Sequence, residues 1–266
     1  MINAYSLAAE LLYGDMDKTY PIITESEMKL REKTMKLSLK TITLLKNFSD
    51  INQSILFKKG NSLRTISVMK NVLAEATIDE DLPTDFGIYD LSQFLNGLSL
   101  HTRPELDFQN DQFLYIKEGS MRSKYFYADP KVIVQPPEDG KITLPSEDVH
   151  FTLTADQLGK LLKAAGIYQL PDLSVVGKNG VVKILVRDKK NDTSNDFAIT
   201  VGETDDTFSF NFKVENVKIP CSEPDIKSGL PNAYEVVVSK SNLSRFRSKN
   251  GDLTYYIALE PDSTFE

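Results

Sequence analysis

Side chains that could carry out catalysis or bind a metal are few in this chain and lie far apart in the sequence. His101 and His150 have no Cys or His nearby at the spacing that metal ligands show. The acidic runs 79–81 and 205–206 fall between expected strands, where acidic turns are common, so they do not indicate a magnesium site. The run 178–180 fits a hairpin turn and lacks the spacing of a phosphate-binding loop. Because nucleophile signatures are also absent, the sequence predicts a protein that is not an enzyme and has no metal or cofactor.

Lysine side chains show a clearer pattern, because they recur on two segments with helical periodicity. Four positions recur 114 residues further along the chain: Leu39, Leu44, Lys46 and Phe48 match Leu153, Leu158, Lys160 and Leu162. The chain is nevertheless acidic, with 31 Lys and Arg against 38 Asp and Glu and a net charge of -7. This combination suggests that positive charge is concentrated on one surface. The alternative, that these lysines only solvate exposed helix faces, stays open.

Composition restricts the class of protein. The chain has 266 residues, of which 41% are hydrophobic and 26% charged, as in soluble globular proteins with room for two domains. No apolar run is long enough to cross a bilayer, and the N-terminus lacks the pattern of a secretory signal. Cys221 is the only cysteine, so no intrachain disulfide can form and a reducing compartment is expected. The negative net charge argues against a diffusely basic DNA-binding domain but permits a small basic face.

Periodicity and turn residues predict the same order of elements twice, separated by a Pro-rich linker at 129–148. In the first half we expect helices at 40–48 and 90–99, and strands at 35–39, 54–59, 62–70, 72–78, 85–89, 105–109, 112–117 and 122–128. In the second half we expect a helix at 154–166, a helical turn at 214–219, and strands at 149–153, 172–177, 181–187, 196–201, 207–213, 233–239, 242–248 and 253–259. Residues 1–34 precede this pattern and are expected to be an extension.

Local signals support these helices and hairpins. Asp90 fits an N-cap, and Thr154 with Gln157 fits a capping box. Apolar stripes at helical spacing predict that one face of each helix is buried: Leu91, Phe94, Leu95 and Leu98 in one, and Leu158, Leu161, Leu162 and Ala165 in the other. The pairs at 179–180 and 250–251, both Asn-Gly, predict two-residue hairpin turns.

Several short motifs resemble the sliding clamp of T-even-type bacteriophages, the DNA polymerase processivity factor. In the first half these motifs are Met35-Lys36-Leu37-Ser38, Leu44-Leu45-Lys46-Asn47-Phe48 and Ile88-Tyr89-Asp90-Leu91. The segments Tyr256-Ile257-Ala258-Leu259-Glu260 and Asp262-Ser263-Thr264 are similar to the C-terminus of the same protein. The resemblance spans 35–266. The family's chains usually begin where Met35 stands, and the connector and the loop 189–195 match weakly.

The resemblance implies an α+β DNA-clamp fold with two similar domains per chain, each with antiparallel sheets outside and two helices inside, closing as a trimeric ring. It places the first clamp domain at 35–134, the interdomain connector at 135–147 and the second clamp domain at 148–266, with 1–34 as an N-terminal extension of unknown role. First domain and second domain of neighbouring subunits would meet around the ring.

The resemblance also implies the function: a clamp that encircles duplex DNA without sequence preference and tethers the replicative DNA polymerase. The implied partners are a clamp-loader ATPase complex, late-transcription factors and two further copies of the chain, in the cytoplasm of the infected bacterial host and away from membranes. The expected DNA-facing residues are Lys36, Lys40, Lys46, Lys160, Lys163, Lys213 and Lys218. The expected pocket for a partner peptide comprises Val134, Pro136, Ala258, Leu259 and Pro261. The alternative is a β-rich virion structural protein that does not encircle DNA.

Overall fold

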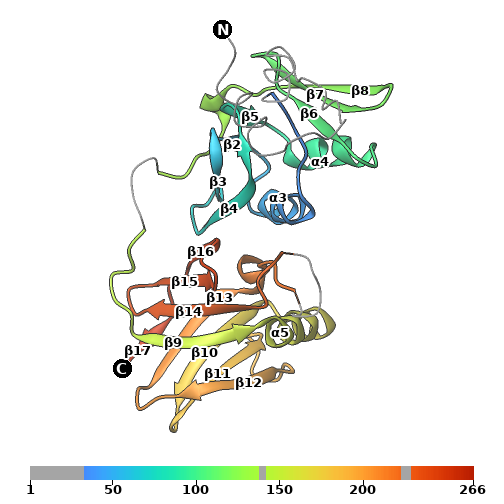
Figure 1. Cartoon of the computed structure of the whole chain (residues 1–266). Coiled ribbons are helices and arrows are strands. Elements are labelled where there is room, and N and C mark those ends of the chain that lie inside the picture. Colours follow the sequence, from blue (N-terminus) through green and yellow to red (C-terminus); the bar gives the residue numbers. More distant parts are fainter. Residues whose placement is uncertain (1–32, 138–141, 223–228) are drawn as a thin grey trace, which may run out of the picture.

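The computed structural model describes residues 33–137, 142–222 and 229–266 (Figure 1). The first half contains, in chain order, β1 (Thr34–Met35), α3 (Leu39–Ile51), β2 (Ile55–Phe57), β3 (Gly60–Ile66), β4 (Val72–Leu82), β5 (Phe86–Ile88), α4 (Leu91–Ser99), β6 (Glu105–Asp107), β7 (Phe113–Glu118), β8 (Met121–Phe126) and the 3-10 turn η1 (Pro130–Val132). The second half contains β9 (Val149–Thr154), α5 (Ala155–Tyr168), β10 (Asp172–Lys178), β11 (Val181–Arg187), β12 (Phe197–Glu203), β13 (Phe208–Lys213), the 3-10 turn η2 (Val214–Val217), β14 (Ala233–Ser239), β15 (Leu243–Ser248), β16 (Leu253–Ala258) and β17 (Thr264–Phe265).

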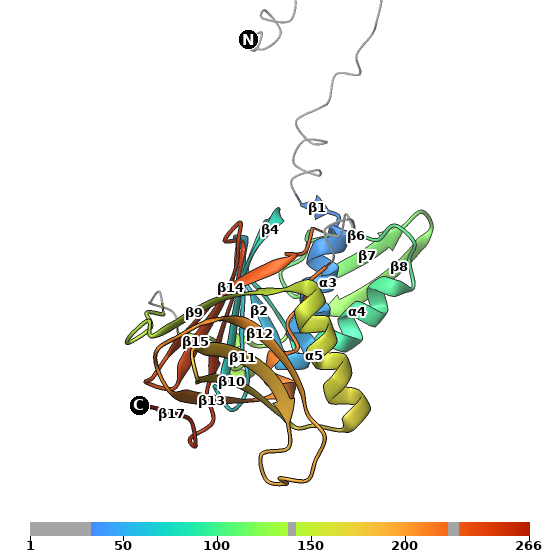
Figure 2. The same ribbon diagram turned by 90° about the horizontal axis from the view of Figure 1, so that it is seen from below.

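The strands form antiparallel sheets, one of which joins the two halves. The six-stranded sheet has the order β3-β4-β16-β15-β14-β9, and β4 of the first half pairs directly with β16 of the second. A four-stranded sheet, β1-β6-β7-β8, lies at one end of the chain's arc, and a five-stranded sheet, β12-β11-β10-β13-β17, lies at the other. Helices α4, α3 and α5 lie in a row on the opposite side from the six-stranded sheet (Figures 1 and 2). The antiparallel α+β fold predicted from the sequence is confirmed.

Capping interactions fix where the helices begin. The side chain of Asp90 accepts a hydrogen bond from the backbone N–H of Gln93, and Thr154 and Gln157 form a complete capping box. Both contacts confirm the sequence prediction. Ser38 caps α3 in the same way, by accepting from the backbone N–H of Thr41. Because each cap satisfies a backbone donor that the helix leaves unpaired, the start of each helix is held firmly.

Glu80 on β4 ties the first turn of α3 to the sheet. Its carboxylate accepts from the Thr41 hydroxyl at 2.6 Å and from the backbone N–H of Ser38. Burial of the carboxyl group opposes its ionisation, but these hydrogen bonds outweigh burial and hold the pKa of Glu80 below its ordinary value. The charged carboxylate therefore helps to orient α3 on its sheet.

One apolar core runs through both halves. The stripes predicted from the sequence are buried, except that Leu162 is only partly covered. Tyr234 on β14 and Tyr255 on β16 are fully buried. The Tyr255 hydroxyl donates to the Asn47 side chain of α3 at 2.7 Å. This hydrogen bond crosses between the halves, so the core fixes α3 relative to the second half.

The predicted boundaries at the start of the first half are wrong. Residues 35–39 do not form a strand: β1 covers only Thr34–Met35, and α3 runs over Leu39–Ile51 rather than 40–48. The expected extension 1–34 is also too long, because Thr34 pairs with Asp107 in the sheet. Residues 1–32 of that extension lie outside the described residues. The cause is Ser38, whose side chain starts the helix earlier than apolar periodicity alone suggests.

The internal repeat also differs in detail from the spacing of 114 residues. The N-caps Ser38 and Thr154 are 116 residues apart, and Leu39 is 69% exposed whereas Leu153 is buried. Leu39 and Leu153 therefore do not occupy equivalent places. The second half also has a shorter second helix than the first, since η2 covers only Val214–Val217.

Turn predictions are partly confirmed. Asn179 and Gly180 both have positive φ and close a two-residue turn between β10 and β11. At Asn250 and Gly251 only the glycine has positive φ, and the loop between β15 and β16 has four residues rather than two. In the predicted linker 129–148, the turn η1 was not predicted, and residues 138–141 lie outside the described part of the chain.

Candidate nucleic-acid interface

The exposed faces of α3 and α5 carry lysines that point away from the core. Lys46 on α3 and Lys163 on α5 are exposed, as is Lys36 two residues before the N-cap of α3. None of these three ammonium groups has an ion-pair partner among residues 33–137, 142–222 and 229–266. Their positive charges are therefore not compensated by a neighbouring carboxylate within these ranges.

Lys218 joins this surface through a contact between the halves. The Asn47 side chain on α3 donates to the backbone carbonyl of Lys218 at 2.7 Å, which brings the segment after η2 against the middle of the helix. Because Lys46 adjoins Asn47 in sequence, the exposed side chain of Lys218 and that of Lys46 come from neighbouring parts of the same surface. We call Lys36, Lys46, Lys163 and Lys218 the helix-side lysines.

Lys160 is exposed but already has a partner within its own helix. Its ammonium lies 2.7 Å from a carboxylate oxygen of Asp156, four residues earlier, and both side chains are more than half exposed. Such exposed helix pairs contribute only about 0.3–0.5 kcal/mol in water. A phosphate group can therefore displace Asp156 from Lys160.

The structure does not support a DNA-facing role for Lys40, because its ammonium is committed to the second half of the chain. It lies 2.5 Å from Asp252 in the loop between β15 and β16, and the two side chains are only 14% and 17% exposed. Asp252 also accepts from the Ser248 hydroxyl at 2.9 Å. We therefore assign Lys40 to the contact between the halves rather than to the DNA-facing set.

Lys213 is committed in the same way. Its ammonium lies 2.7 Å from Asp172, a carboxylate that is 1% exposed, and 3.9 Å from Glu260. The hydrogen bond to Asp172 outweighs the effect of burial and raises the pKa of Lys213 above its usual value. Its role is to compensate a buried carboxylate, and we remove Lys213 from the predicted DNA-facing set as well.

A cavity of about 300 Å³ lies where the connector begins. Val134 and Pro136 line it together with residues of β2 and β3, among them Arg64, and with Lys58 from the turn between these strands. Arg64 is held in place by a 2.8 Å ion pair to Glu75 and a 3.0 Å hydrogen bond to the Pro137 carbonyl. Ala258, Leu259 and Pro261 do not line this cavity.

Those last three residues instead lie past the β3–β4 hairpin. The backbone N–H of Ala258 donates to the carbonyl of Asn71 in the turn of that hairpin, at 2.8 Å. On the opposite side, the Asn52 amide donates to the carbonyls of Ile66 and Val134. The hairpin is thus flanked by the connector on one side and by the end of β16 on the other.

Comparison with known proteins identifies the family. A family model described as DNA polymerase processivity factor matches residues 36–135. The sliding clamp of Vibrio phage KVP40 is 31% identical over 233 residues, which cover 85% of this chain and 99% of the relative. The sliding clamp of Enterobacteria phage T4 is 30% identical over 242 residues, covering 87% of this chain and all of the relative (100%). The chain belongs to the phage sliding-clamp family.

Solved clamps from outside the phages share the fold at much lower identity. PCNA from A. fulgidus, solved with the C-terminal region of FEN-1 bound, matches 87% of this chain and 99% of its own, with a TM-score of 0.61 and 16% identity. A DNA polymerase III subunit beta sliding clamp from Bartonella birtlesii matches 85% of this chain and 65% of its own, with a TM-score of 0.60 and 11% identity. At these identities the likeness shows the fold alone.

In this clamp, residues near the predicted peptide pocket were missed by the sequence analysis. Val68 and Met69, at the tip of the β3–β4 hairpin, are 66% and 82% exposed. They belong to the turn whose two ends contact Ala258 and, through Asn52, Val134. The sequence analysis placed both residues inside an expected strand at 62–70, whereas β3 ends at Ile66 and leaves them in the turn.

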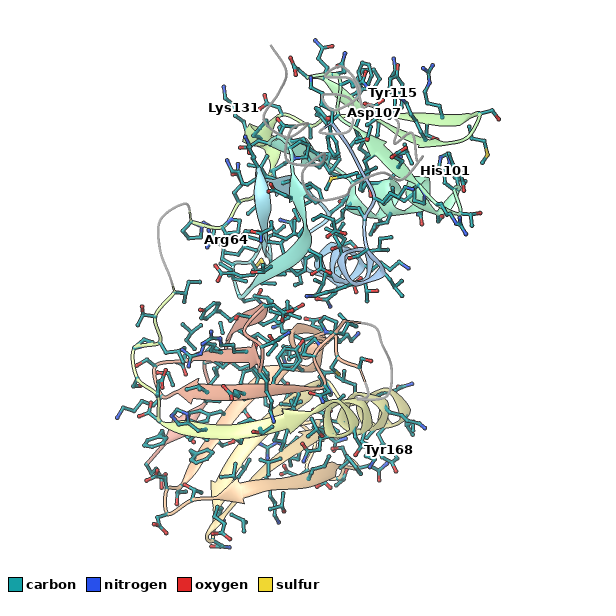
Figure 3. All side chains as sticks on the ribbon, viewed as in Figure 1. Arg64, His101, Asp107, Tyr115, Lys131 and Tyr168 are labelled. Carbon is teal, nitrogen blue, oxygen red and sulfur yellow. The ribbon has the colours of Figure 1, made fainter. Side chains whose placement is uncertain are left out.

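The described part of the clamp contains no cluster of three or more His, Cys, Asp or Glu side chains arranged to hold a metal ion. His101 is buried at the end of α4, and His150 lies exposed on β9, 3.9 Å from Glu147 (Figure 3 shows His101). Within residues 33–137, 142–222 and 229–266, no helix combines the length and the apolar composition needed to cross a bilayer.

Proposed function

We propose that this sliding clamp closes as a homotrimeric ring around duplex DNA and tethers the replicative polymerase during processive synthesis. The observation that carries the proposal is the row formed by α4, α3 and α5 (Figure 2), on whose exposed side the helix-side lysines have no acidic partner in the described chain. The role is mechanical and requires no catalytic group.

The chemistry of these lysines fits a protein that holds DNA without reading it. An ammonium group is a hydrated point charge that suits phosphates and is poor at bidentate recognition of bases. Phosphate contacts carry no sequence information, so the clamp can slide. Three chains of net charge -7 give a ring of -21, which repels duplex DNA at long range. Loading therefore requires a partner, which we propose is a clamp-loader ATPase complex.

Two unpaired sheet edges offer a way to close the ring. β8 is one edge strand of the first-half sheet and β12 is one edge strand of the second-half sheet, and the two lie at opposite ends of the molecule. Pairing the backbone edge of β8 of one subunit with that of β12 of the next would satisfy the hydrogen-bonding groups of both edges.

Exposed apolar side chains lie beside both edges. At the first end, Leu100 is 72% and Met121 is 51% exposed, and at the other end Ile167 is 64% and Tyr168 is 46% exposed (Figure 3 labels Tyr168). A head-to-tail contact would bury one set against the other. Such a heterologous interface makes a ring when the rotation between subunits closes.

The proposed docking site for the polymerase is the apolar surface around the β3–β4 hairpin. It combines the predicted residues Val134, Pro136, Ala258 and Pro261 with the exposed hairpin residues Val68 and Met69, whereas the predicted residue Leu259 is only 7% exposed and belongs to the core. We propose that a short polymerase peptide binds there, and that the clamp loader and the late-transcription factors of the phage use the same surface in the cytoplasm of the infected bacterium.

Two matched variants separate assembly from partner binding. Val68→Asp and Ile167→Asp each place a carboxylate on a side chain that is about two-thirds exposed, 66% and 64%. Native mass spectrometry should show that Ile167→Asp shifts the trimer towards monomer, while Val68→Asp leaves the trimer intact and weakens polymerase stimulation. A stable monomer in the unmodified protein would refute the ring.

Stimulation of the cognate polymerase on primed circular and primed linear DNA tests the function itself. The proposal expects much greater stimulation on the circle, since a ring runs off open ends. Equal stimulation would favour the alternative of a β-rich virion structural protein, for which charge reversal at Lys46 and Lys163 would also have no effect.

A further inference from the structure

The outer face of the β7–β8 hairpin carries three aromatic and three basic side chains in facing pairs. Neighbouring positions across the two strands pair Phe113 with Phe126, Tyr115 with Lys124, and Lys117 with Arg122. These six residues share one face because side chains alternate along a strand. We call them the aromatic–basic face.

The side chains of this face contact one another closely. The rings of Phe113 and Phe126 lie 5.5 Å apart, the Arg122 guanidinium lies 4.4 Å from the centre of the Tyr115 ring, and the Lys124 ammonium lies 4.3 Å from that of Phe113. Phe126 is 62% exposed despite its size. Cations stacked on aromatic rings form a preorganised surface that attracts an acidic and partly apolar partner.

The proposed ring closure uses the backbone edge of β8, but none of the proposed activities of the clamp uses the side chains of the aromatic–basic face. Leu114 and Ile116, which alternate with its residues on β7, are buried in the core on the side of α4. Tyr115 therefore lies on the side of the sheet opposite to α4 (Figure 3). Lys117 pairs with Asp107, but Arg122 and Lys124 form no ion pair with any residue in the described ranges. The face is thus separate from the helix-side lysines and from the peptide pocket.

We propose that residues 1–32 of the same chain cover the aromatic–basic face. This segment enters the fold through β1, which belongs to the same sheet as β7 and β8. The register places Thr34, Asp107, Tyr115 and Lys124 in one row across the four strands. The backbone N–H of Phe108 also donates to the carbonyl of Lys33 at 2.8 Å, so the sheet holds the residue that directly follows the segment 1–32.

The segment has the reach and the charge for this contact. From β1 to β8 is three strand spacings, or about 14 Å. Glu27 stands seven residues before Thr34, and seven extended residues span up to about 23 Å. Residues 1–32 contain six acidic and three basic side chains, and the run 20–27 combines Tyr20, Ile22 and Ile23 with Glu25 and Glu27. Tethering favours this occupant over a free peptide, because it acts at a high effective concentration.

The contact gives residues 1–32 a role that complements encirclement. Carboxylates placed over Arg122 and Lys124 neutralise the basic charge on the outer face of the sheet. The helix-side lysines then remain the accessible cationic surface, which discourages DNA from binding to the outside of the clamp.

Lysine acylation followed by mass spectrometry tests the proposal on the full chain and on a chain that lacks residues 2–32. We expect Lys124 to react several-fold more slowly in the full chain, and to become as reactive as in the truncated chain when Glu25→Lys and Glu27→Lys are introduced together. Lys183, exposed on β11 in the other half, is the control and should react equally in all three proteins. Equal Lys124 rates, in chains with the same solution mass, would overturn the proposal.

Disulfide trapping then shows which copy supplies the segment. In a Cys221→Ser background, Glu27→Cys with Lys124→Cys should oxidise to a cross-link within one chain, whereas Glu27→Cys with Lys183→Cys should not. A cross-link that joins two chains would refute the intrachain contact, as would equal cross-linking of both pairs.

Discussion

Lys40 and Lys46 lie six residues apart on α3, yet their structural surroundings assign them opposite roles. The Lys40 ammonium is 2.5 Å from Asp252 and the side chain is 14% exposed, whereas Lys46 is exposed and has no ion-pair partner among the described residues. Replacing each with methionine keeps most of the aliphatic stem and removes the charge. We predict that Lys40→Met destabilises the fold, whereas Lys46→Met weakens DNA binding.

The magnitude follows from burial. Exposed ion pairs contribute about 0–1 kcal/mol, and breaking a buried pair costs about 3–5 kcal/mol. Because the Lys40–Asp252 pair is largely but not fully covered, its loss should lower the free energy of unfolding by about 2–3 kcal/mol. For a chain of this size the Tm should fall by about 4–12 °C. Lys46→Met should change the free energy of unfolding by less than about 0.5 kcal/mol.

Two assays measure the two effects separately. Thermal and urea unfolding report stability, and binding to a short linear duplex over a range of salt concentrations reports phosphate contacts. Each lost contact reduces the slope of log K against log salt by about 0.9. Lys46→Met should flatten this slope, and Lys40→Met should leave it unchanged. If Lys40→Met flattened the slope as much as Lys46→Met and left the Tm unaltered, the assignment of Lys40 to the contact between the halves would be wrong.

Three further predictions concern the contacts that hold the helices and the connector. Lys213→Met should lower the free energy of unfolding measured in urea by about 3–5 kcal/mol, because it leaves the buried carboxylate of Asp172 without its cationic partner. Adding Asp172→Asn should restore most of that loss. If it restored nothing, the pairing of Lys213 with Asp172 would be contradicted. The lowered pKa of Glu80 stabilises the fold fully above its ordinary value of 4.5, and this stabilisation is lost as pH falls through the lowered pKa. As the pH is lowered from 5 to acid unfolding at about pH 3, the Tm of Glu80→Gln should therefore fall less steeply than the Tm of the unmodified chain. Parallel curves of Tm against pH for the two proteins would argue against the role of Glu80. Gly87→Ala should lower the free energy of unfolding by about 1–3 kcal/mol, since a Cβ would meet the Ala128 carbonyl oxygen at 2.7 Å. An unchanged Tm would contradict this, because it would show that the backbone at Ala128 shifts at no cost.

Local signals predicted much of the fold correctly. The N-caps at Asp90 and Thr154 and the buried stripe that begins at Leu91 depend on residues close together in sequence, so a pattern of three or four residues is enough to find them. The start of α3 was misplaced because Ser38 and Glu80 hold it together, and Glu80 lies 42 residues away on another element.

The roles of the site residues were harder to predict, because exposure depends on partners that are distant in sequence. Helical spacing places Lys40 and Lys46 about 120° apart around one helix, and it gives no sign of Asp252, which is 212 residues further on. Lys213 likewise depends on Asp172, which no motif singles out. The predicted peptide pocket remains a prediction, and its five residues do not line one cavity: Val134 and Pro136 line the cavity at the start of the connector, and Ala258, Leu259 and Pro261 do not.

The most direct test of the account is to load the clamp onto a nicked circular plasmid with its cognate loader, isolate the complex and then cut the DNA once. The ring mechanism predicts that the clamp stays on the circular DNA through a wash at high salt. Once the DNA has been cut, the clamp should slide off an open end. Release from the uncut circle at high salt would show that charge rather than closure holds the protein, and retention on the linear DNA would contradict encirclement.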